Sequence, residues 1–324
     1  MKRAGAATLI LVAILALAAS WVAPNAPERR FNDLLNAPPT RVHVWDGGPR
    51  APFVYRQRVV SRLERRFETV TTERVPLRWF ADGTLVTADP RGGVPLLLLG
   101  ADGYGRDVFS RVVHGSRLTL ALALLATLGA TLLGAAIGGV SGYAGGRVDL
   151  VLSRVTEFVL VLPAIYVVLA LRATLPLIVP SSTVFLSLTG IFILLGWPSV
   201  ARGVRAIVVS ERTRDYVTAA EALGASRARV LLRHLLPAAG GHVVTQATLL
   251  LPAFILAEAT MSFIGLGFPE ASPTWGTMLQ EASNVALLGD APWALAPAAA
   301  IFLVVFAVNL VVQGTSRVPV QLER

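Results

Sequence analysis

The 324 residues contain one lysine, Lys2, and its position excludes a phosphate-binding P-loop. A phosphate-binding loop of the form GxxxxGK[ST] needs a lysine that reaches the β- and γ-phosphates of a nucleotide. The chain is therefore not itself a P-loop ATPase. Cysteine is absent, which excludes disulfides and thiolate metal sites. The four histidines lack the HExxH spacing of a metalloprotease; they are His43, His114, His234 and His242.

Glu258 is the remaining candidate for chemistry, because it stands inside the apolar run from 243 to 266. An ionisable residue within a membrane segment marks a functional site by default. A buried hydrogen-bond anchor between two helices is the alternative interpretation. We expect no enzyme activity, cofactor or metal in this chain; a membrane-embedded hydrolase that uses Glu258 or the inner histidines is the rival function.

The composition of the chain indicates the class of protein that carries these residues. The chain is 54% hydrophobic and 15% charged, whereas soluble domains carry roughly 25% charged residues. It is therefore predicted to be a membrane protein. The net charge of +9 does not indicate nucleic-acid binding, because much of the arginine lies in one polar segment and in short loops beside apolar runs. The positive-inside rule explains arginine in such loops.

Six apolar stretches approach the roughly 20 residues that a spanning helix needs. We predict an all-α polytopic membrane protein of about six transmembrane helices, with a small β-containing extracytoplasmic domain after the first. A cleaved signal peptide is the alternative for the first stretch, and an uncleaved anchor is favoured because the run is long. The stretches cover residues 4–22, 118–140, 150–171, 183–196, 243–266 and 293–312.

Arginine sets the predicted orientation. Seven arginines lie between the fourth and fifth stretches, and burying them would cost on the order of 20 kcal/mol. That loop is predicted to be cytoplasmic, as are both termini. Loops beyond about 60 residues translocate regardless of charge, so the arginine-rich segment 24–115 is placed outside. The predicted parts are an anchor 1–23, the outer segment 24–115, a five-helix core 116–316 with an inner loop 199–240, and a tail 317–324.

The outer segment has the composition of a small packed unit. Its aromatic residues supply apolar surface, and Asp82-Gly83 stands between two strand-like runs, which predicts a hairpin. The aromatic residues are Trp45, Phe53, Tyr55, Trp79 and Phe80.

The second apolar stretch carries a small residue at every fourth position, and residues four apart share one helix face. Such a face permits close helix packing in lipid. Packing within this subunit and packing against a partner remain equally open. The residues are Ala126, Ala130, Gly134, Gly138 and Gly142.

The polar segment TAAEALGASRARVLLRHLLP, residues 218–237, interrupts the apolar runs. A helix is predicted over 214–223 and is ended by Gly224. Ser226 is a candidate N-cap for a second helix over 227–236, which Pro237 is expected to close. A helix pair lying on anionic headgroups and a simple positive-inside anchor are alternatives, but the glycine elbow is more structure than either requires.

This segment resembles a cytoplasmic motif of ABC importer permeases, written EAA, three residues, Gly, nine residues, I-x-L-P. Thr218-Ala219-Ala220, Gly224 and His234-Leu235-Leu236-Pro237 fit its spacing. Thr218 replaces the glutamate and His234 the isoleucine, so Glu221 is considered as the source of the missing charge. The resemblance implies a coupling helix that docks on a separate ATPase subunit. The coupling residues it implies are Tyr216, Thr218, Ala219, Ala220, Glu221, Gly224, Ala225, Ser226, Arg227 and Arg229.

Two further stretches resemble the second, C-type permease of the dipeptide, oligopeptide and nickel branch. They are GADGYGRDVFSRVVHGSRLTL, residues 100–120, and EATMSFIGLGFPEASPTWGTML, residues 258–279. Asp102, Arg106 and Asp107 in the first stretch are expected to order the outer entrance of a span. Glu258, Gly134, Gly138 and Gly142 are the candidates for the pathway or for packing.

The resemblance implies a location in a bacterial inner membrane. It also implies the partners: a homologous second permease, cytoplasmic ATP-binding subunits that hold the ATP, an extracytoplasmic solute-binding protein and the bilayer, with no nucleic acid. Peptides are favoured as substrate over nickel or other small solutes, because clustered histidine and cysteine are absent. An ion-driven secondary transporter is a further rival, but inverted repeats, which that class often shows, are not evident.

Overall fold

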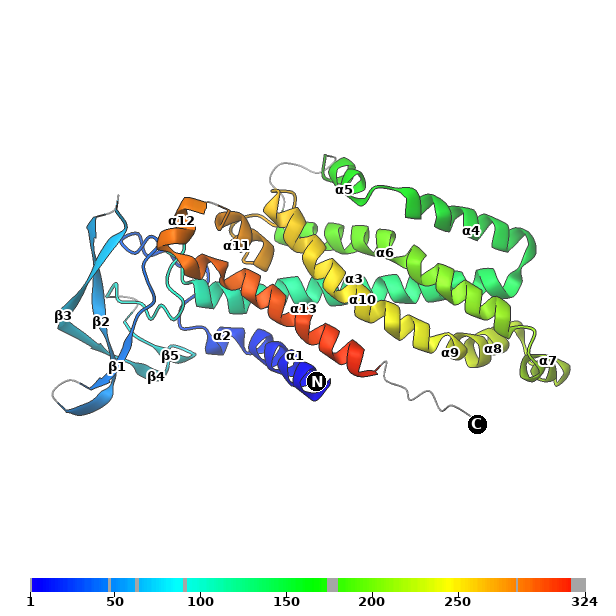
Figure 1. Ribbon diagram of the computed structural model, residues 1–324, viewed down its shortest axis with the longest axis horizontal. Coiled ribbons are helices and arrows are strands. Elements are labelled where there is room, and N and C mark those ends of the chain that lie inside the picture. The colour runs from blue at the N-terminus through cyan, green and yellow to red at the C-terminus, as the bar shows by residue number, and fades with distance from the viewer. Residues whose placement is uncertain are drawn as a thin grey trace, which may run out of the picture. The chain divides into compact units, whose positions relative to one another are not determined.

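The computed structural model describes residues 2–45, 48–61, 64–89, 92–173, 180–283 and 285–315 (Figure 1). The predicted tail 317–324 lies outside these residues. The chain forms two compact units: residues 1–120 with 259–324, and residues 121–258. The long helices α3 (Val108–Ala144) and α10 (Gly240–Phe263) each contribute to both units. The sequence-based division at residues 23, 115 and 316 describes sides of a membrane and remains a prediction.

The first unit packs its first and last helices together. An added Cβ on Gly5 of α1 would lie 2.6 Å from the carbonyl oxygen of Ala307 on α13, so glycine permits the close contact. The helices of this unit besides the start of α3 and the end of α10 are α1 (Lys2–Leu17), α2 (Ala19–Val22), α11 (Trp275–Glu281), α12 (Val285–Asp290), the 3₁₀ turn Pro292–Leu295 and α13 (Ala296–Thr315).

The same unit contains five strands in two antiparallel sheets. The first sheet has the order β1-β2-β3 and the second is the β4–β5 hairpin. The hairpin turns at Asp82 and Gly83, whose φ angles are 53° and 77°, the left-handed pair that a two-residue type I′ turn requires. The predicted hairpin is therefore confirmed. The strands are β1 (Val42–Trp45), β2 (Pro49–Ser61), β3 (Arg66–Pro76), β4 (Arg78–Ala81) and β5 (Thr84–Thr87).

The expectation that aromatic residues pack this outer segment is wrong in detail. Only Phe53 of the five is buried, and its ring lies edge-on to that of Tyr55. The core beneath the strands is aliphatic instead, formed by Val54, Ala88, Val94 and Leu96. Trp45, Trp79 and Phe80 are exposed.

The second unit is helical throughout its described residues. Helix α4 ends at Val161, and the axis of α5 is bent by 86° from that of α4. This break is expected, because Pro163 disfavours helical geometry in the residue before it, Leu162. The elements besides α3 and α10 are α4 (Gly146–Val161), α5 (Ala164–Ala173), α6 (Ser181–Glu211), α7 (Asp215–Ala222), α8 (Arg227–Val230), the π-helical turn Leu231–Leu235 and α9 (Leu236–Ala238).

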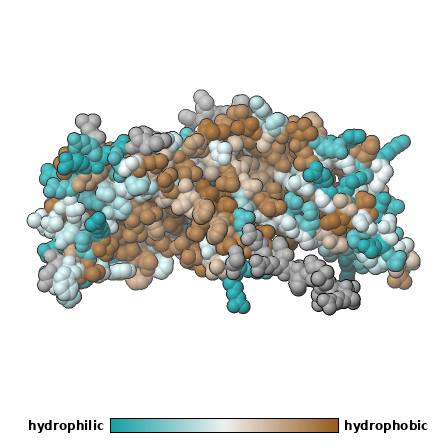
Figure 2. All heavy atoms as spheres, in the orientation of Figure 1, coloured by the Kyte–Doolittle hydropathy of each residue, from teal (hydrophilic) through white to brown (hydrophobic). Residues whose placement is uncertain are grey.

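Among the residues that the structure describes, four helices are long and apolar enough to cross a membrane: residues 108–144, 181–211, 240–263 and 292–312. The bent pair α4–α5 makes up to five. The expected count of six is therefore not confirmed. The first stretch falls short because α1 ends at Leu17 and a separate turn, α2, follows. Hydrophilic residues gather over the strands and over α7 and α8, whereas apolar residues cover the long helices (Figure 2).

The small-residue face of α3 packs within the second unit, against α6. An added Cβ on Gly134 would lie 2.6 Å from the carbonyl oxygen of Trp197, and one on Gly142 would lie 2.8 Å from that of Arg205. Gly138 faces the backbone of Ala201 in the same way. The sequence left open whether this face packs within the subunit or against a partner. The contacts described here lie within one subunit.

Candidate functional site

The polar segment forms two short helices that meet at a glycine elbow. Gly224 has φ +82°, and its amide donates to the carbonyl of Glu221 while that of Ala225 donates to Ala220, at 2.9 and 3.0 Å. This pair of bonds is the Schellman motif, which ends a helix at a left-handed residue. Ser226 then accepts the amide of Arg229 with its side chain and so caps α8. Local sequence signals predicted this elbow.

The expected end of the second helix at Pro237 is wrong. The chain stays helical from Arg227 through Ala238, with a π-helical turn at Leu231–Leu235 and Pro237 in the first turn of α9. In a regular helix, the ring of Pro237 would clash with a carbonyl of the preceding turn. Here the preceding turn is the π-helical one. The elbow is thereby joined to α10 by helical structure.

The elbow rests on an apolar base. Val217 of α7 and Val230 of α8 are buried against Val204 and Val208 of α6, together with Leu235 of the π-helical turn. Each short helix therefore contributes one buried valine beneath it. Burying a valine stabilises by about 1.5 to 3 kcal/mol, enough to hold a short helix that would not persist alone.

Two tyrosines tie the elbow to the long helices. Tyr143 at the end of α3 donates to the Glu221 carboxylate at 2.8 Å, and Tyr216 donates to Glu211 of α6 at 2.7 Å. Glu221, which was considered as the missing docking charge, thus bonds within its own chain. Thr218 donates to the backbone of Arg214.

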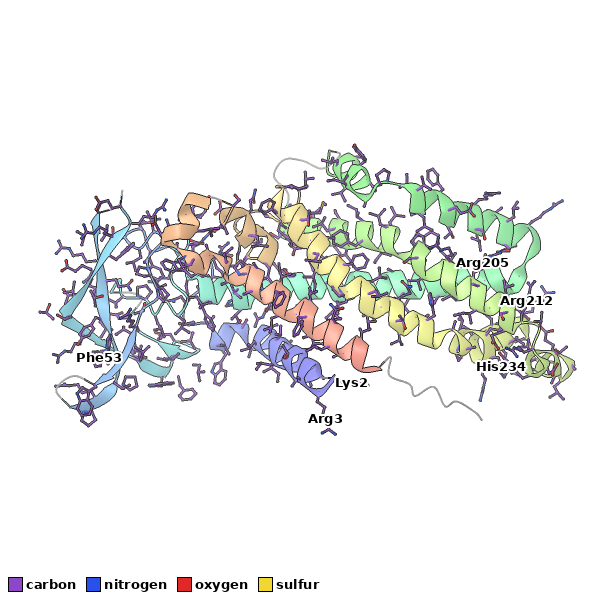
Figure 3. All side chains as sticks on the ribbon, viewed as in Figure 1. Lys2, Arg3, Phe53, Arg205, Arg212 and His234 are labelled. Carbon is purple, nitrogen blue, oxygen red and sulfur yellow. The ribbon has the colours of Figure 1, made fainter. Side chains whose placement is uncertain are left out.

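The same end of the second unit holds a strong ion pair that sequence reasoning missed. Arg205 of α6 donates to both carboxylate oxygens of Asp149 on α4, at 2.5 and 2.6 Å, and Ser141 of α3 donates to the same group. Figure 3 labels Arg205, Arg212 and His234 near α7 and α8. In the sequence, the position of Asp149 directly before the apolar stretch 150–171 could have indicated this ion pair.

The outer face of the elbow is exposed and mixed in character. Leu223, directly before the glycine, is 89% exposed. Around it Ala219, Gly224, Arg227 and Arg229 are also exposed, whereas Ala220 and Ala225 are half-buried. An apolar tip flanked by arginines is suited to a cleft with an acidic rim.

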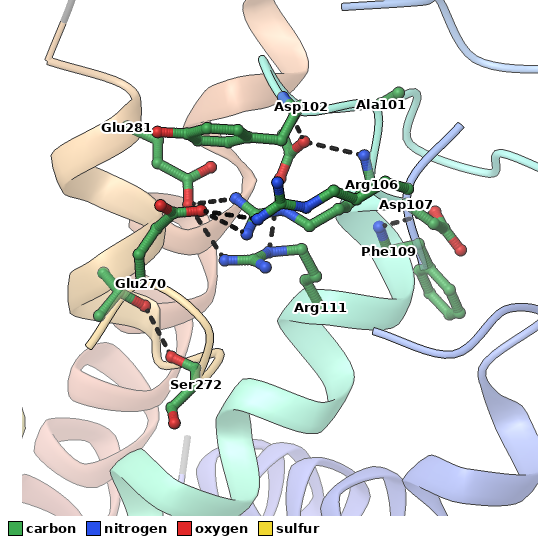
Figure 4. A network of polar contacts seen from close by, with 12 residues as sticks. Ala101, Asp102, Arg106, Asp107, Phe109, Arg111, Glu270, Ser272 and Glu281 are labelled. Atoms are coloured by element: carbon green, nitrogen blue, oxygen red, sulfur yellow. Dashed lines mark hydrogen bonds and ion pairs between the residues drawn. The ribbon is translucent and has the colours of Figure 1, made fainter. Parts of the chain in front are cut away.

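The residues expected at the outer entrance divide into two groups in the first unit (Figure 4). Asp102 accepts the amides of Tyr104 and Arg106 at 2.9 Å each, and its other oxygen accepts Arg106 Nε at 2.7 Å. Arg106 also donates to Glu270 at 2.8 Å and to Glu281 at 2.6 Å. One guanidinium therefore joins three carboxylates.

A second buried arginine completes this cluster. Arg111 donates to Glu281 at 3.1 Å, and both arginines are almost fully buried. Burial raises the pKa of Glu281 to about 7, while Arg111 opposes the shift. Sequence reasoning did not single out Arg111, Glu270 or Glu281, although the first two stand in the quoted motifs. The structure brings those motifs together, since Trp275 Nε1 also donates to Val112 at 3.0 Å.

Asp107 is separate from the cluster and fully buried. Its carboxylate accepts Ser110 Oγ at 2.5 Å, Asn25 Nδ2 at 3.0 Å and the amide of Phe109 at 3.1 Å. Burial raises its pKa to about 6. The group fixes the first turn of α3 to the chain that follows α2.

Glu258, on α10, is fully buried. No cluster of three or more histidine, aspartate or glutamate side chains suited to a metal ion occurs among the described residues.

Comparisons with known proteins show the family of the chain. Residues 116–318 match the family described as binding-protein-dependent transport system inner membrane component. A putative peptide permease protein of Brucella ovis is 36% identical over 66% of this chain and 70% of its own length. The oligopeptide transport system permease protein OppC of Lactococcus lactis is 34% identical over 64% and 69%. The dipeptide permease DppC of Alkalihalophilus pseudofirmus is 33% identical over 66% and 68%.

A solved methionine ABC transporter, MetNI in inward-facing conformations, covers 64% of this chain and 98% of its own at 18% identity and a TM-score of 0.48, too weak a likeness to support a statement on the fold. The family match spans more than half of the chain. The chain therefore belongs to the binding-protein-dependent transport system inner membrane components, the permease subunits of ABC importers, in their dipeptide and oligopeptide branch.

Proposed function

We propose that this permease imports di- or oligopeptides and receives its driving force at the elbow formed by α7 and α8. The peptide substrate is supported by the names of three relatives, which are all peptide permeases. The drive at the elbow is supported by one observation above all: an exposed tip, Leu223 to Arg229, is built on a rigid and well-tied base.

Membrane topology follows from the elbow's charge. The elbow is cytoplasmic in this proposal, both termini are on the same side, and α1 with α2 forms the first of six spans. The strands and the ion-pair cluster then lie outside, where a solute-binding protein delivers substrate. A homologous second permease completes the pathway, and two ATP-binding subunits lie beneath.

The mechanism is a rigid-body transfer of motion. ATP binding closes the ATPase pair, and the docked elbow moves with it. Because Tyr143 and Tyr216 tie α7 to α3 and α6, that motion reaches the spans directly. Packed elements switch between discrete arrangements rather than deform continuously, so a small shift at the elbow is converted to alternating access.

Gly224→Val tests the proposal. Nothing lies within 4 Å of an added Cβ at Gly224, so the change acts only through the left-handed backbone that valine avoids. We expect at least a tenfold loss of peptide uptake with normal membrane insertion. Gly83→Val is the matched control, since Gly83 also has positive φ and open space. Unchanged uptake by Gly224→Val, with the ATPase still bound, would overturn the proposed role.

A further inference from the structure

Three large aromatic side chains near the end of the first helix pair are exposed in the first unit. Trp21 on α2 is 48% exposed, and Trp79 and Phe80 on β4 are 54% and 72% exposed. The rings of Trp21 and Phe80 lie 6.2 Å apart, and α2 runs beside the β4–β5 hairpin (Figure 1). Trp79 adjoins Phe80 in the chain, and we call these three exposed residues the aromatic patch: Trp21, Trp79 and Phe80.

The backbone departs from normal strand geometry to make this patch. Phe80 has φ +52°, a strained conformation that is a genuine outlier for a bulky residue. Successive side chains of a regular strand point to opposite faces. Here the left-handed residue interrupts that alternation, and two neighbouring rings are both left exposed.

The level of the patch relative to the bilayer can be judged from α1. Leu17, at the end of α1, is 82% exposed, and Ile10, Leu11 and Ile14 are more than half exposed. An apolar helix surface of this kind is suited to lipid. Arg117 of α3 donates to the carbonyls of Ala16 and Leu17 and to Ser20 Oγ, at 2.5, 2.7 and 2.9 Å.

A guanidinium at the end of an apolar helix marks the boundary of the hydrocarbon, because a charge is costly deeper in the bilayer. Trp21 stands four residues beyond Leu17, about 6 Å along a helix. This is the headgroup level, where tryptophan is enriched in membrane proteins.

The strand segment as a whole carries an excess of positive charge. Residues 41–98 contain ten arginines against six acidic residues. Arg78, the neighbour of Trp79, is more than half exposed and lies 3.9 Å from Asp82. Basic residues near a membrane surface are attracted to anionic lipid. Aromatic and basic side chains together are typical of a segment that lies in the interface.

We propose that the β4–β5 hairpin is a membrane anchor whose aromatic patch lies among the anionic phospholipid headgroups at the outer end of α1. The anchor holds the strand segment against the bilayer. The inference rests on the proposed place of α1 in the membrane and is independent of coupling to the ATPase.

Site-directed spin labelling tests this directly, because the chain has no native cysteine. The variant Phe80→Cys is labelled in the assembled transporter, reconstituted in vesicles of phosphatidylethanolamine and phosphatidylglycerol. Collision rates are measured with oxygen, which concentrates in lipid, and with a water-soluble nickel chelate. Trp79→Cys, which keeps Phe80, repeats the measurement. Trp45→Cys on β1 is the control, since Trp45 is 67% exposed and outside the patch.

The proposal expects the ratio of oxygen to chelate collisions at positions 79 and 80 to lie well above that at position 45 and below that of a label in the hydrocarbon. Equal access of the chelate at 45, 79 and 80 would overturn it. Immobilisation at 80 only after addition of the solute-binding protein would also overturn it, in favour of a protein partner. Leu17→Cys provides the hydrocarbon reference. An aqueous label at 17 would refute the placement of α1, whereas a lipid label at 17 with an aqueous label at 80 would refute the anchor alone.

Discussion

At the scale of single residues, the structure gives the charged groups different tasks. Arg106 and Arg111 are buried beside Asp102 and the largely buried Glu281, and the exposed Glu270 also contacts Arg106. Removing one partner of a buried pair is strongly destabilising, by about 3 to 5 kcal/mol, because the other charge is left uncompensated. This cluster therefore fixes the beginning of α3 to α11.

Asp107 gives the permease a pH-dependent stability. Its pKa of about 6 in the folded state lies above its ordinary value of 3.8 because of burial. The folded state then holds the proton more tightly, so this stabilisation is complete below pH 3.8 and is lost as the pH rises to about 6. Two pKa units correspond to on the order of 3 kcal/mol.

Asp107→Asn should remove that dependence. In thermal unfolding of detergent-solubilised protein, the wild type is expected to lose stability between pH 4 and pH 6 relative to the variant. Asp33→Asn, an exposed aspartate in the first unit, should leave the wild-type profile unchanged. If the thermal stability of Asp107→Asn and that of the wild type changed in parallel with pH, the raised pKa of Asp107 would be contradicted.

At the scale of elements, the sequence predicted features that are set by residues close together in the chain, and it missed features that are set by contacts between distant segments. Gly224 and Ser226 act within one turn of chain, so the elbow followed from residue type and spacing. The ion-pair cluster did not, because Arg111 and Glu281 are 170 residues apart and their pairing depends on the packing of α3 against α11. The misplaced end at Pro237 has a similar origin, since tertiary packing of Leu235 favours continued helix.

Tyr143 is the element-scale link between the elbow and α3. Tyr143→Phe removes the hydroxyl that donates to Glu221 and leaves the ring in place. We expect uptake to fall several-fold while ATP hydrolysis continues, so that more ATP is consumed per peptide imported. Tyr166→Phe, on the exposed face of α5, is the matched control. Uptake and hydrolysis falling together would indicate a general loss of folding instead.

At the scale of the whole molecule, the two ends of α3 lie in different compact units, and so do the two ends of α10. The two ends of each helix therefore have different surroundings. The end of α3 in the first unit is held by the ion-pair cluster and by Trp275. In the second unit, the end of α3 is joined to the elbow through Tyr143, and the beginning of α10 is joined to it through the π-helical turn. Composition and arginine distribution were sufficient to predict a multi-pass membrane protein, but they did not fix the number of spans, because the break at Ala18 shortens the first apolar helix.

Disulfide cross-linking of the elbow to the ATPase subunit tests the central claim most directly. Leu223→Cys replaces a side chain of the elbow that is 89% exposed, and Val217→Cys, at a position buried beneath the elbow, is the control. With single cysteines placed around the surface cleft of the ATP-binding subunit, Leu223→Cys should cross-link in high yield, with a yield that changes on ATP binding, and Val217→Cys should not. Failure of Leu223→Cys to cross-link in an assembled complex that still transports peptide would contradict the account.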